Sequence, residues 1–183
     1  MPELLEGKGR NPDGIDMKHA TAVIHEATRI PESVTVGAYA VIEDGVEIGG
    51  GTVIESHATI RSGTVLGERC FVDSQTVLGG LPQDLQFNPR TPSGVRIGDR
   101  VVIREGVTVN RASREGEFTE IGNDCFLMAN SHLGHDCRVA DHAVLANAVL
   151  LGGHVHVGPH SFLGGGAAVH QFCRIGESAM IGG

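Results

Sequence analysis

The 183-residue sequence contains no tryptophan, and aromatic residues make up only 4% of it. It has no excess of positive charge. The formal net charge is −8 at pH 7, which argues against general nucleic-acid binding because that function requires a basic surface. No apolar run approaches the length that spans a bilayer, and no basic start followed by an apolar stretch marks a signal peptide. We therefore expect a protein without a membrane span or a leader.

The four cysteines form no Cys-x-x-Cys pair, so neither a disulfide framework nor a structural zinc site is expected. Cys70, Cys125, Cys137 and Cys173 all occupy one small, inward position of a six-residue repeat. We interpret them as small core residues. Unpaired cysteines are typical of a reducing compartment, which predicts a cytoplasmic location.

The six-residue repeat is the main feature that the sequence does contain. Aliphatic residues recur at every sixth position from Ile24 to Leu78, from Ile97 to Val109 and from Ile121 to Ile181, which gives ten, three and eleven repeats, or 24 in all. A small residue stands two positions before each aliphatic one. This period is neither that of a helix nor that of a half-buried strand. It is typical of a hexapeptide parallel β-helix, in which each coil contains three short strands.

The interruptions of the repeat predict the domain organisation. Residues 1–18 show no periodicity and are expected to form an irregular lead-in, whereas residues 19–183 are expected to form one β-helix domain. Gly79–Gly94 carries three prolines, and Asn110–Phe118 carries Gly116 and several charges; both are interpreted as external loops. The predicted fold class is therefore all-β, a parallel β-helix of about eight coils with two external loops.

The residue before each aliphatic position points outward, and every third repeat shares one flank of the predicted prism. Two flanks are largely apolar and one is charged. The apolar flanks begin with Thr35, Val53 and Phe71 and with Val23, Val41 and Thr59, and the charged flank begins with Arg29, Glu47 and Val65. An outward apolar stripe along several coils marks an interface. Two such flanks closed by symmetry predict a homotrimer.

Histidines gather at one corner of this prism, where the flank that begins with Val23 ends. Both loops leave from this corner. His135, Gly153 and Gln171 follow there at intervals of eighteen residues, or one coil, with His154 and His170 beside the last two. The corner separates a partner-facing flank from a charged one, so we expect a cleft between subunits here.

His135 and Asp136 form the candidate catalytic pair. A histidine next to a carboxylate can serve as general base, with the acid holding its tautomer. His132 points outward from the same coil. Gly152 and Gly153 either let backbone N–H groups approach a ligand carbonyl or are required only for a tight turn. A single histidine at a corner is most simply a solvated residue, but three coils in register favour a site.

Five segments resemble the UDP-N-acetylglucosamine 3-O-acyltransferase family, the acyl-carrier-protein-dependent first enzymes of lipid A synthesis. They are PQDLQF (Pro82–Phe87), IREGVTVNR (Ile103–Arg111), SHLGHDC (Ser131–Cys137), GGHV (Gly152–Val155) and AVHQFCRIG (Ala168–Gly176). The resemblance covers about residues 19–183 and implies a left-handed β-helix, a homotrimer and active sites between subunits. It also implies a C-terminal helical domain, which this sequence, ending in mid-repeat, is expected to lack.

The resemblance further implies a role for each residue at the corner. His135 would deprotonate the sugar 3-hydroxyl with Asp136 orienting it, the hydroxyl would attack the thioester on acyl carrier protein, and the Gly153 N–H would stabilise the oxyanion. The UDP-sugar would be bound by Asp84, Gln86, His132, His154, His170 and Gln171. Gln86 stands where the family commonly has a lysine. Gly183 falls in the region that resembles the family's acyl-length ruler, which sets the length of the acyl chain. No metal or other cofactor is implied, because the thioester supplies its own leaving group.

Three alternatives remain open. One is another hexapeptide acyltransferase with a different acceptor, such as the later N-acyltransferase of lipid A synthesis, whose extra N-terminal domain has no counterpart here. A second is a γ-carbonic-anhydrase-like metalloenzyme, which needs three histidines converging on zinc. The third is a trimeric scaffold without catalytic activity.

Overall fold

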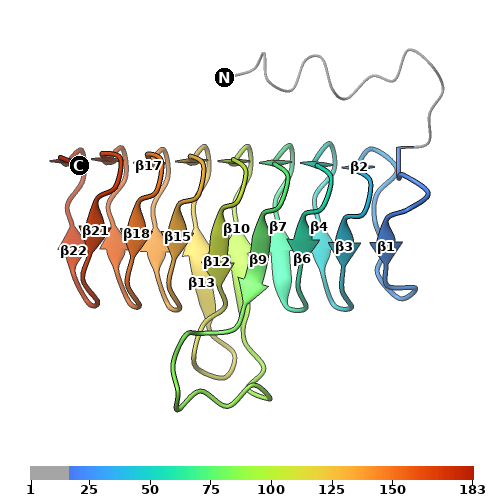
Figure 1. Cartoon of the computed structure of the whole chain (residues 1–183), viewed down its shortest axis with the longest axis horizontal. Coiled ribbons are helices and arrows are strands. Elements are labelled where there is room, and N and C mark those ends of the chain that lie inside the picture. The colour runs from blue at the N-terminus through green and yellow to red at the C-terminus, as the bar shows by residue number, and fades with distance from the viewer. Residues whose placement is uncertain (1–16) are drawn as a thin grey trace.

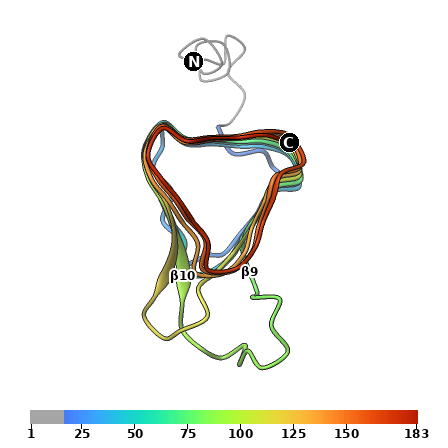
Figure 2. The same ribbon diagram turned by 90° about the vertical axis from the view of Figure 1, so that its left-hand side faces the viewer.

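The computed structural model describes residues 17–183, so the expected lead-in over residues 1–18 lies outside the described residues except for Met17 and Lys18. The described chain is all-β. Its 23 strands, each two to four residues long, wind into a parallel β-helix with three faces (Figure 1). Seen along its axis in Figure 2, the helix has a triangular cross-section.

Each face is one sheet, and we number the sheets in the order in which a coil passes through them. The first sheet contains β1 (Val23–Ile24), β3 (Val41–Ile42), β6 (Thr59–Ile60), β9 (Val77–Gly80), β12 (Thr108–Asn110), β15 (His132–Leu133), β18 (Leu150–Leu151) and β21 (Ala168–Val169). The second contains β4 (Glu47–Ile48), β7 (Thr64–Leu66), β10 (Gly94–Ile97), β13 (Phe118–Ile121), β16 (Arg138–Val139), β19 (His156–Val157) and β22 (Arg174–Ile175). The third contains β2 (Thr35–Val36), β5 (Val53–Ile54), β8 (Phe71–Val72), β11 (Val102–Ile103), β14 (Phe126–Leu127), β17 (Val144–Leu145), β20 (Phe162–Leu163) and β23 (Met180–Ile181).

The strand register confirms the predicted flanks. In the first sheet Thr108 pairs with Val77 on one side and with His132 on the other, and His132 pairs in turn with Leu150. Residues of equal phase therefore lie side by side on successive coils, at the roughly 4.8 Å spacing of paired strands. The two apolar flanks are the first and third sheets, and the charged flank is the second.

One of the predicted repeats does not form a strand. Ile30 packs partly buried against the core, but the second sheet begins only at β4. The backbone carbonyl of Ile30 accepts a hydrogen bond from Lys18 Nζ at 3.2 Å instead of from a neighbouring strand. Pro31 follows and has no N–H to donate to a ladder. The first coil is therefore incomplete on this face.

The interior is a column of stacked aliphatic side chains. In the third sheet Leu127 pairs with Leu145, which pairs with Leu163, and all three side chains are fully buried. Burying a side chain of this kind stabilises the fold by roughly 1.5–3 kcal/mol. The narrow interior accounts for the absence of tryptophan, because every coil has to accept the same small triangular cross-section.

Side chains at the small inward position of the repeat also donate hydrogen bonds to backbone carbonyls of the neighbouring coil. Ser161 Oγ donates to the Gly176 carbonyl at 2.7 Å, and Cys137 Sγ donates to the Gly152 carbonyl at 3.1 Å. Each bond reaches a carbonyl fifteen residues further along the chain, at a corner. These residues therefore fill the core and also fix the corners.

The four cysteines are free, but they are not equivalent. Cys70, Cys125 and Cys137 are buried, and burial raises the pKa of their thiols to about 11, 11 and 12, respectively. The interpretation as a core residue is wrong for Cys173, which is exposed because no described coil packs over it.

This difference predicts the pattern of thiol modification. In the native protein a water-soluble disulfide reagent is expected to modify Cys173 quickly, whereas the other three thiols should react only on unfolding, since a protonated buried thiol is a poor nucleophile. The absorbance of the released thiolate gives the number of fast sites per chain. Cys173→Ser should remove the fast phase, and a second fast thiol would contradict the described packing.

Both interruptions of the repeat are external loops, and both leave the corner between the first and second sheets. Loop 1 (residues 81–93) connects β9 to β10, and loop 2 (residues 111–117) connects β12 to β13. Figures 1 and 2 show both loops projecting from the same side of the prism. Arg111 joins them: its Nη2 donates to the Pro89 carbonyl at 2.6 Å, and its guanidinium stands 5.3 Å from the centre of the Phe87 ring. In residues 17–183 no helix is long and apolar enough to cross a membrane.

Candidate active site

A groove of about 550 Å³ runs over the outer face of the first sheet, beside the corner that carries the loops. Outward residues of successive strands line it: Thr108, His132, Leu150 and Ala168. The corner residues Gly134, His135, Gly152, Gly153 and Gln171 line its edge, together with Gln83 from loop 1 and Asn110. The groove therefore combines an apolar sheet face with the histidine-bearing corner.

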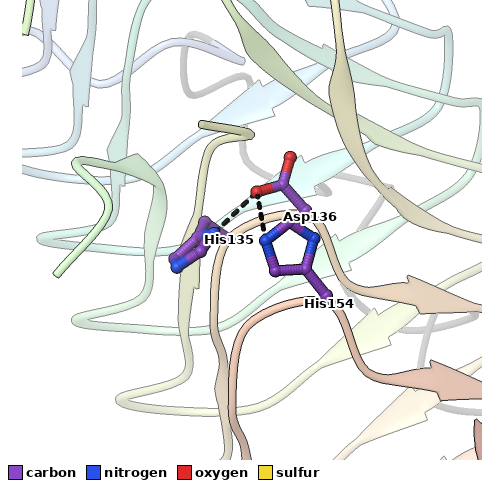
Figure 3. A group of neighbouring side chains, drawn as sticks. All are labelled: His135, Asp136 and His154. Atoms are coloured by element: carbon purple, nitrogen blue, oxygen red, sulfur yellow. Dashed lines mark hydrogen bonds and ion pairs between the residues drawn. The ribbon is translucent and has the colours of Figure 1, made fainter. Parts of the chain in front are cut away.

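Three polar side chains cluster at this edge (Figure 3). His135 Nδ1 lies 2.6 Å from Asp136 Oδ2, and both side chains are mostly buried. An ionised carboxylate only accepts hydrogen bonds, so Nδ1 carries the hydrogen and Nε2 of the neutral ring keeps a free lone pair. His154 Nε2 lies 3.6 Å from the same Asp136 oxygen, and the two imidazole rings meet edge to face. The Asp136 carboxylate therefore orients His135 and faces His154.

Asp136 is held in place by its own backbone and by loop 2. It adopts a left-handed conformation with φ of 60°, and its N–H donates to Thr119 Oγ1 at 2.9 Å. The Ser113 N–H donates to both carboxylate oxygens, at 3.1 and 3.2 Å. Burial raises the pKa of Asp136, but hydrogen bonds from Ser113 and His135 outweigh burial, and the pKa is lowered from its ordinary value. Asp136 is therefore ionised at neutral pH.

Removing the Ser113 N–H should raise the pKa of Asp136. We expect Ser113→Pro, which lacks this donor, to shift the carboxyl titration to higher pH and to lower turnover by about tenfold, since misplacing a catalytic group is costly. Because folding lowers this pKa, the ionised carboxylate stabilises the fold above its unfolded pKa, and this contribution is lost as pH falls through the folded pKa. Ser113→Pro should therefore be less stable at pH 7 while losing less stability in acid.

NMR titration of the Asp136 carboxyl and urea unfolding at several pH values measure both effects. Ser113→Ala keeps the backbone donor and should change the pKa less than Ser113→Pro does. Equal shifts in the two variants would mean that the hydroxyl, rather than the N–H, acts on Asp136.

Gly153 packs directly against the His135 ring. A Cβ atom at position 153 would lie 2.7 Å from Cε1 and from Nε2 of His135, which is closer than real Cβ atoms come. Only glycine therefore allows the ring to occupy this place. The Gly153 N–H makes no hydrogen bond to any residue that the structure describes, although Gly153 is buried and lines the groove. A free N–H beside a general base is what an oxyanion hole requires.

His132 faces the groove as a neutral ring. Its Nδ1 lies 2.8 Å from Thr108 Oγ1. Burial lowers the pKa of His132 below its ordinary value of 6.5, and a hydrogen bond with the Thr108 backbone opposes this shift only in part. The ring can therefore both donate and accept hydrogen bonds at pH 7.

Across residues 17–183 one group of side chains could hold a metal ion. The ligand atoms of His135, Asp136 and His154 all lie within 4.8 Å of one another. The set has two histidines where a carbonic-anhydrase-type zinc site needs three. Asp136 Oδ2 is also already hydrogen-bonded to His135 and Ser113, so a metal would have to displace these donors.

The repeat and the site place the chain among known proteins. The family described as "Bacterial transferase hexapeptide (six repeats)" matches residues 21–62 and 118–153. The acyl-[acyl-carrier-protein]–UDP-N-acetylglucosamine O-acyltransferase of Anaeromyxobacter dehalogenans is 52% identical over 166 residues, which cover 90% of this chain and 64% of the relative. That of Herminiimonas arsenicoxydans is 48% identical over 163 residues, which cover 88% of this chain and 62% of the relative. The structure of LpxA from Acinetobacter baumannii superimposes with a TM-score of 0.88 at 37% identity, over 92% of this chain and 65% of that one.

The chain is similar to UDP-N-acetylglucosamine O-acyltransferases along about 90% of its length. Its β-helix is left-handed like that of LpxA, as the resemblance implied. The chain spans 62–64% of the length of these two curated relatives.

The structure brings together only some of the predicted site residues. His170 is exposed and does not line the groove. Asp84 and Gln86 lie in loop 1, where Asp84 Oδ1 accepts a hydrogen bond from the Gln86 N–H at 2.9 Å; their neighbour Gln83 lines the groove instead. Gly183 follows β23 of the third sheet and therefore lies at a different corner from His135.

Three residues of the candidate site were missed by sequence reasoning. The Phe172 ring stacks on His154 with 4.5 Å between centroids, and the eighteen-residue spacing between them could have indicated this contact. Ser113 reaches Asp136 from loop 2, and Asn110 lines the groove. Neither has a sequence signal, because both positions depend on the path of the chain where the repeat is interrupted.

Proposed function

We propose that this chain transfers a 3-hydroxyacyl group from acyl carrier protein to the 3-hydroxyl of UDP-N-acetylglucosamine, the first step of lipid A synthesis. The observation that carries the proposal is the 2.6 Å hydrogen bond between His135 and Asp136 beside the free N–H of Gly153. The names of relatives that match 88–90% of the chain support the same reaction. We assign the catalytic function to the β-helix of residues 19–183.

In the proposed reaction these residues act one after the other. His135 Nε2 removes the proton of the sugar 3-hydroxyl, and the oxygen attacks the thioester carbonyl carbon. The Gly153 N–H donates to the oxyanion that forms. The carbon–sulfur bond then breaks, and the protonated His135 returns its proton to the leaving thiolate. Asp136 holds the ring in the required tautomer throughout, and the residues need no cofactor for this sequence of steps.

The remaining predicted residues are proposed to bind substrate. His132, His154 and Gln171 lie in or beside the groove and would contact the UDP-sugar. Two residues of loop 1, Asp84 and Gln86, and His170 from the next coil would also contact the UDP-sugar. Gly183 would limit the length of the acyl chain. Within this single chain none of these four residues lies at His135.

A homotrimer would complete the site. The first and third sheets carry exposed apolar side chains, including Val23 at 62%, Leu150 at 48% and Phe162 at 37% exposure. Leu150 lines the groove, so a partner packed on the first sheet would cover the groove and add residues to it. We propose that the trimer works in the cytoplasm, with acyl carrier protein as its donor.

The test is to incubate the protein with UDP-N-acetylglucosamine and a set of 3-hydroxyacyl carrier proteins and to read the products by mass. A product heavier than the acceptor by one acyl group, formed equally well after chelator treatment, is expected. Absence of transfer from every donor would refute the proposal. Metal-dependent hydration of carbon dioxide would support the metalloenzyme instead, for which the His135–Asp136–His154 group is the supporting observation.

A further inference from the structure

Asn110 carries a buried carboxamide without a partner. The residue is only 7% exposed, its Oδ1 is enclosed, and neither Oδ1 nor Nδ2 makes a hydrogen bond to another residue of the described chain, 17–183. Leaving a buried amide unpaired is costly, and native proteins keep few such groups. An unpaired amide at a site therefore indicates a ligand that pairs with it.

The position of Asn110 connects it to the catalytic corner. It is the last residue of β12 and lines the groove together with His135. The register between β12 and β9 shifts at this point, so that Val109 pairs with Leu78 but Asn110 pairs with Gly80. Irregularities of this kind redirect a side chain and are frequent beside active sites. On the other side of β12, Val109 pairs with Leu133 of β15. Asn110 is therefore level with Gly134, the residue before His135.

We infer that the Asn110 carboxamide binds the acceptor sugar, through a hydrogen bond that its Nδ2 donates to an oxygen next to the reacting hydroxyl. The inference rests on the proposed function and adds a residue that determines acceptor specificity. A carboxamide offers one acceptor and two donors, which matches the acetamido group and the hydroxyls of the sugar. Being neutral, it also fixes the sugar without adding a charge next to Asp136.

The test compares the affinity for UDP-N-acetylglucosamine with that for UDP, by calorimetry without any acyl donor. Asn110→Ala is expected to weaken binding of UDP-N-acetylglucosamine about tenfold and to leave binding of UDP unchanged, because the residue contacts the sugar only. The melting temperature should stay the same or rise, since the unpaired amide is gone. Asn147→Ala, at an exposed asparagine of another corner, is the matched control and should change neither affinity.

Each other outcome has a defined meaning. If wild-type protein binds UDP-N-acetylglucosamine and Asn110→Ala binds it equally well, the inference is overturned and the proposed function is not. The same holds if the variant weakens both ligands alike or melts several degrees lower, because Asn110 would then be structural, or if it affects only binding of the pantetheine-linked donor. A wild-type protein that binds no UDP-N-acetylglucosamine overturns the proposed function and this inference with it.

Discussion

Replacing His135 with alanine is expected to lower kcat/KM for acyl transfer by about 10²–10⁴-fold, the usual contribution of a general base. The ring places an imidazole nitrogen with a free lone pair at the edge of the groove and beside the Gly153 N–H. Without it, the sugar hydroxyl has to lose its proton to water. Steady-state kinetics with purified acyl carrier protein give the effect on kcat and on KM separately, and the loss should lie mainly in kcat.

The control for this variant is His25→Ala. His25 is an exposed histidine that follows β1 and lies at the same corner as His135, several coils away. It should retain full activity. Both variants should show the elution volume and the melting curve of the wild type. Turnover by His135→Ala within threefold of the wild type would remove this residue from the chemistry.

Adding one methyl group at Gly153 is expected to lower kcat about 10²-fold. The new Cβ would need the space that the His135 ring occupies, since the two would be 2.7 Å apart. His135 is fixed by its bond to Asp136, so the ring has to tilt away and the base is misplaced by a fraction of an ångström or more. Displacements of this size cost rate rather than binding, so KM for the sugar should change much less than kcat.

Gly165→Ala provides the matched control. A Cβ at Gly165 would meet only the Asn147 carbonyl at 3.5 Å, an ordinary contact, and Gly165 lies at a different corner. Its activity should equal that of the wild type. Unchanged kcat in Gly153→Ala would show that the His135 ring does not have to stand against this glycine during the reaction.

The sequence determined most of the fold because one physical constraint repeats in every coil. Each inward aliphatic residue has to stack on the one eighteen residues away, so the phase of the repeat predicts strand positions, sheets and the corner from which both loops leave. Ile30 is the exception. It has the correct phase, but its carbonyl binds Lys18 and it has no complete coil on one side.

The candidate site could be predicted only where it follows this phase. His135, Gly153 and Gln171 are one coil apart and lie at one corner. Asn110 and Ser113 lie where the repeat is interrupted, so their contacts depend on a register shift and on the closure of loop 2. The phase of the repeat also predicts that Gly183 lies at another corner. It comes thirty residues after Gly153, which is not a whole number of eighteen-residue coils.

The hydrogen bond from Cys137 to the Gly152 carbonyl has a consequence at the surface of the protein. That carbonyl belongs to the same peptide plane as the Gly153 N–H, and no cis peptide bond occurs in the described chain. In a trans peptide the two groups point in opposite directions. By drawing the oxygen toward the interior, the thiol turns the N–H outward. A sulfur atom that no substrate can touch thus sets the direction of the dipole on which the tetrahedral intermediate would depend.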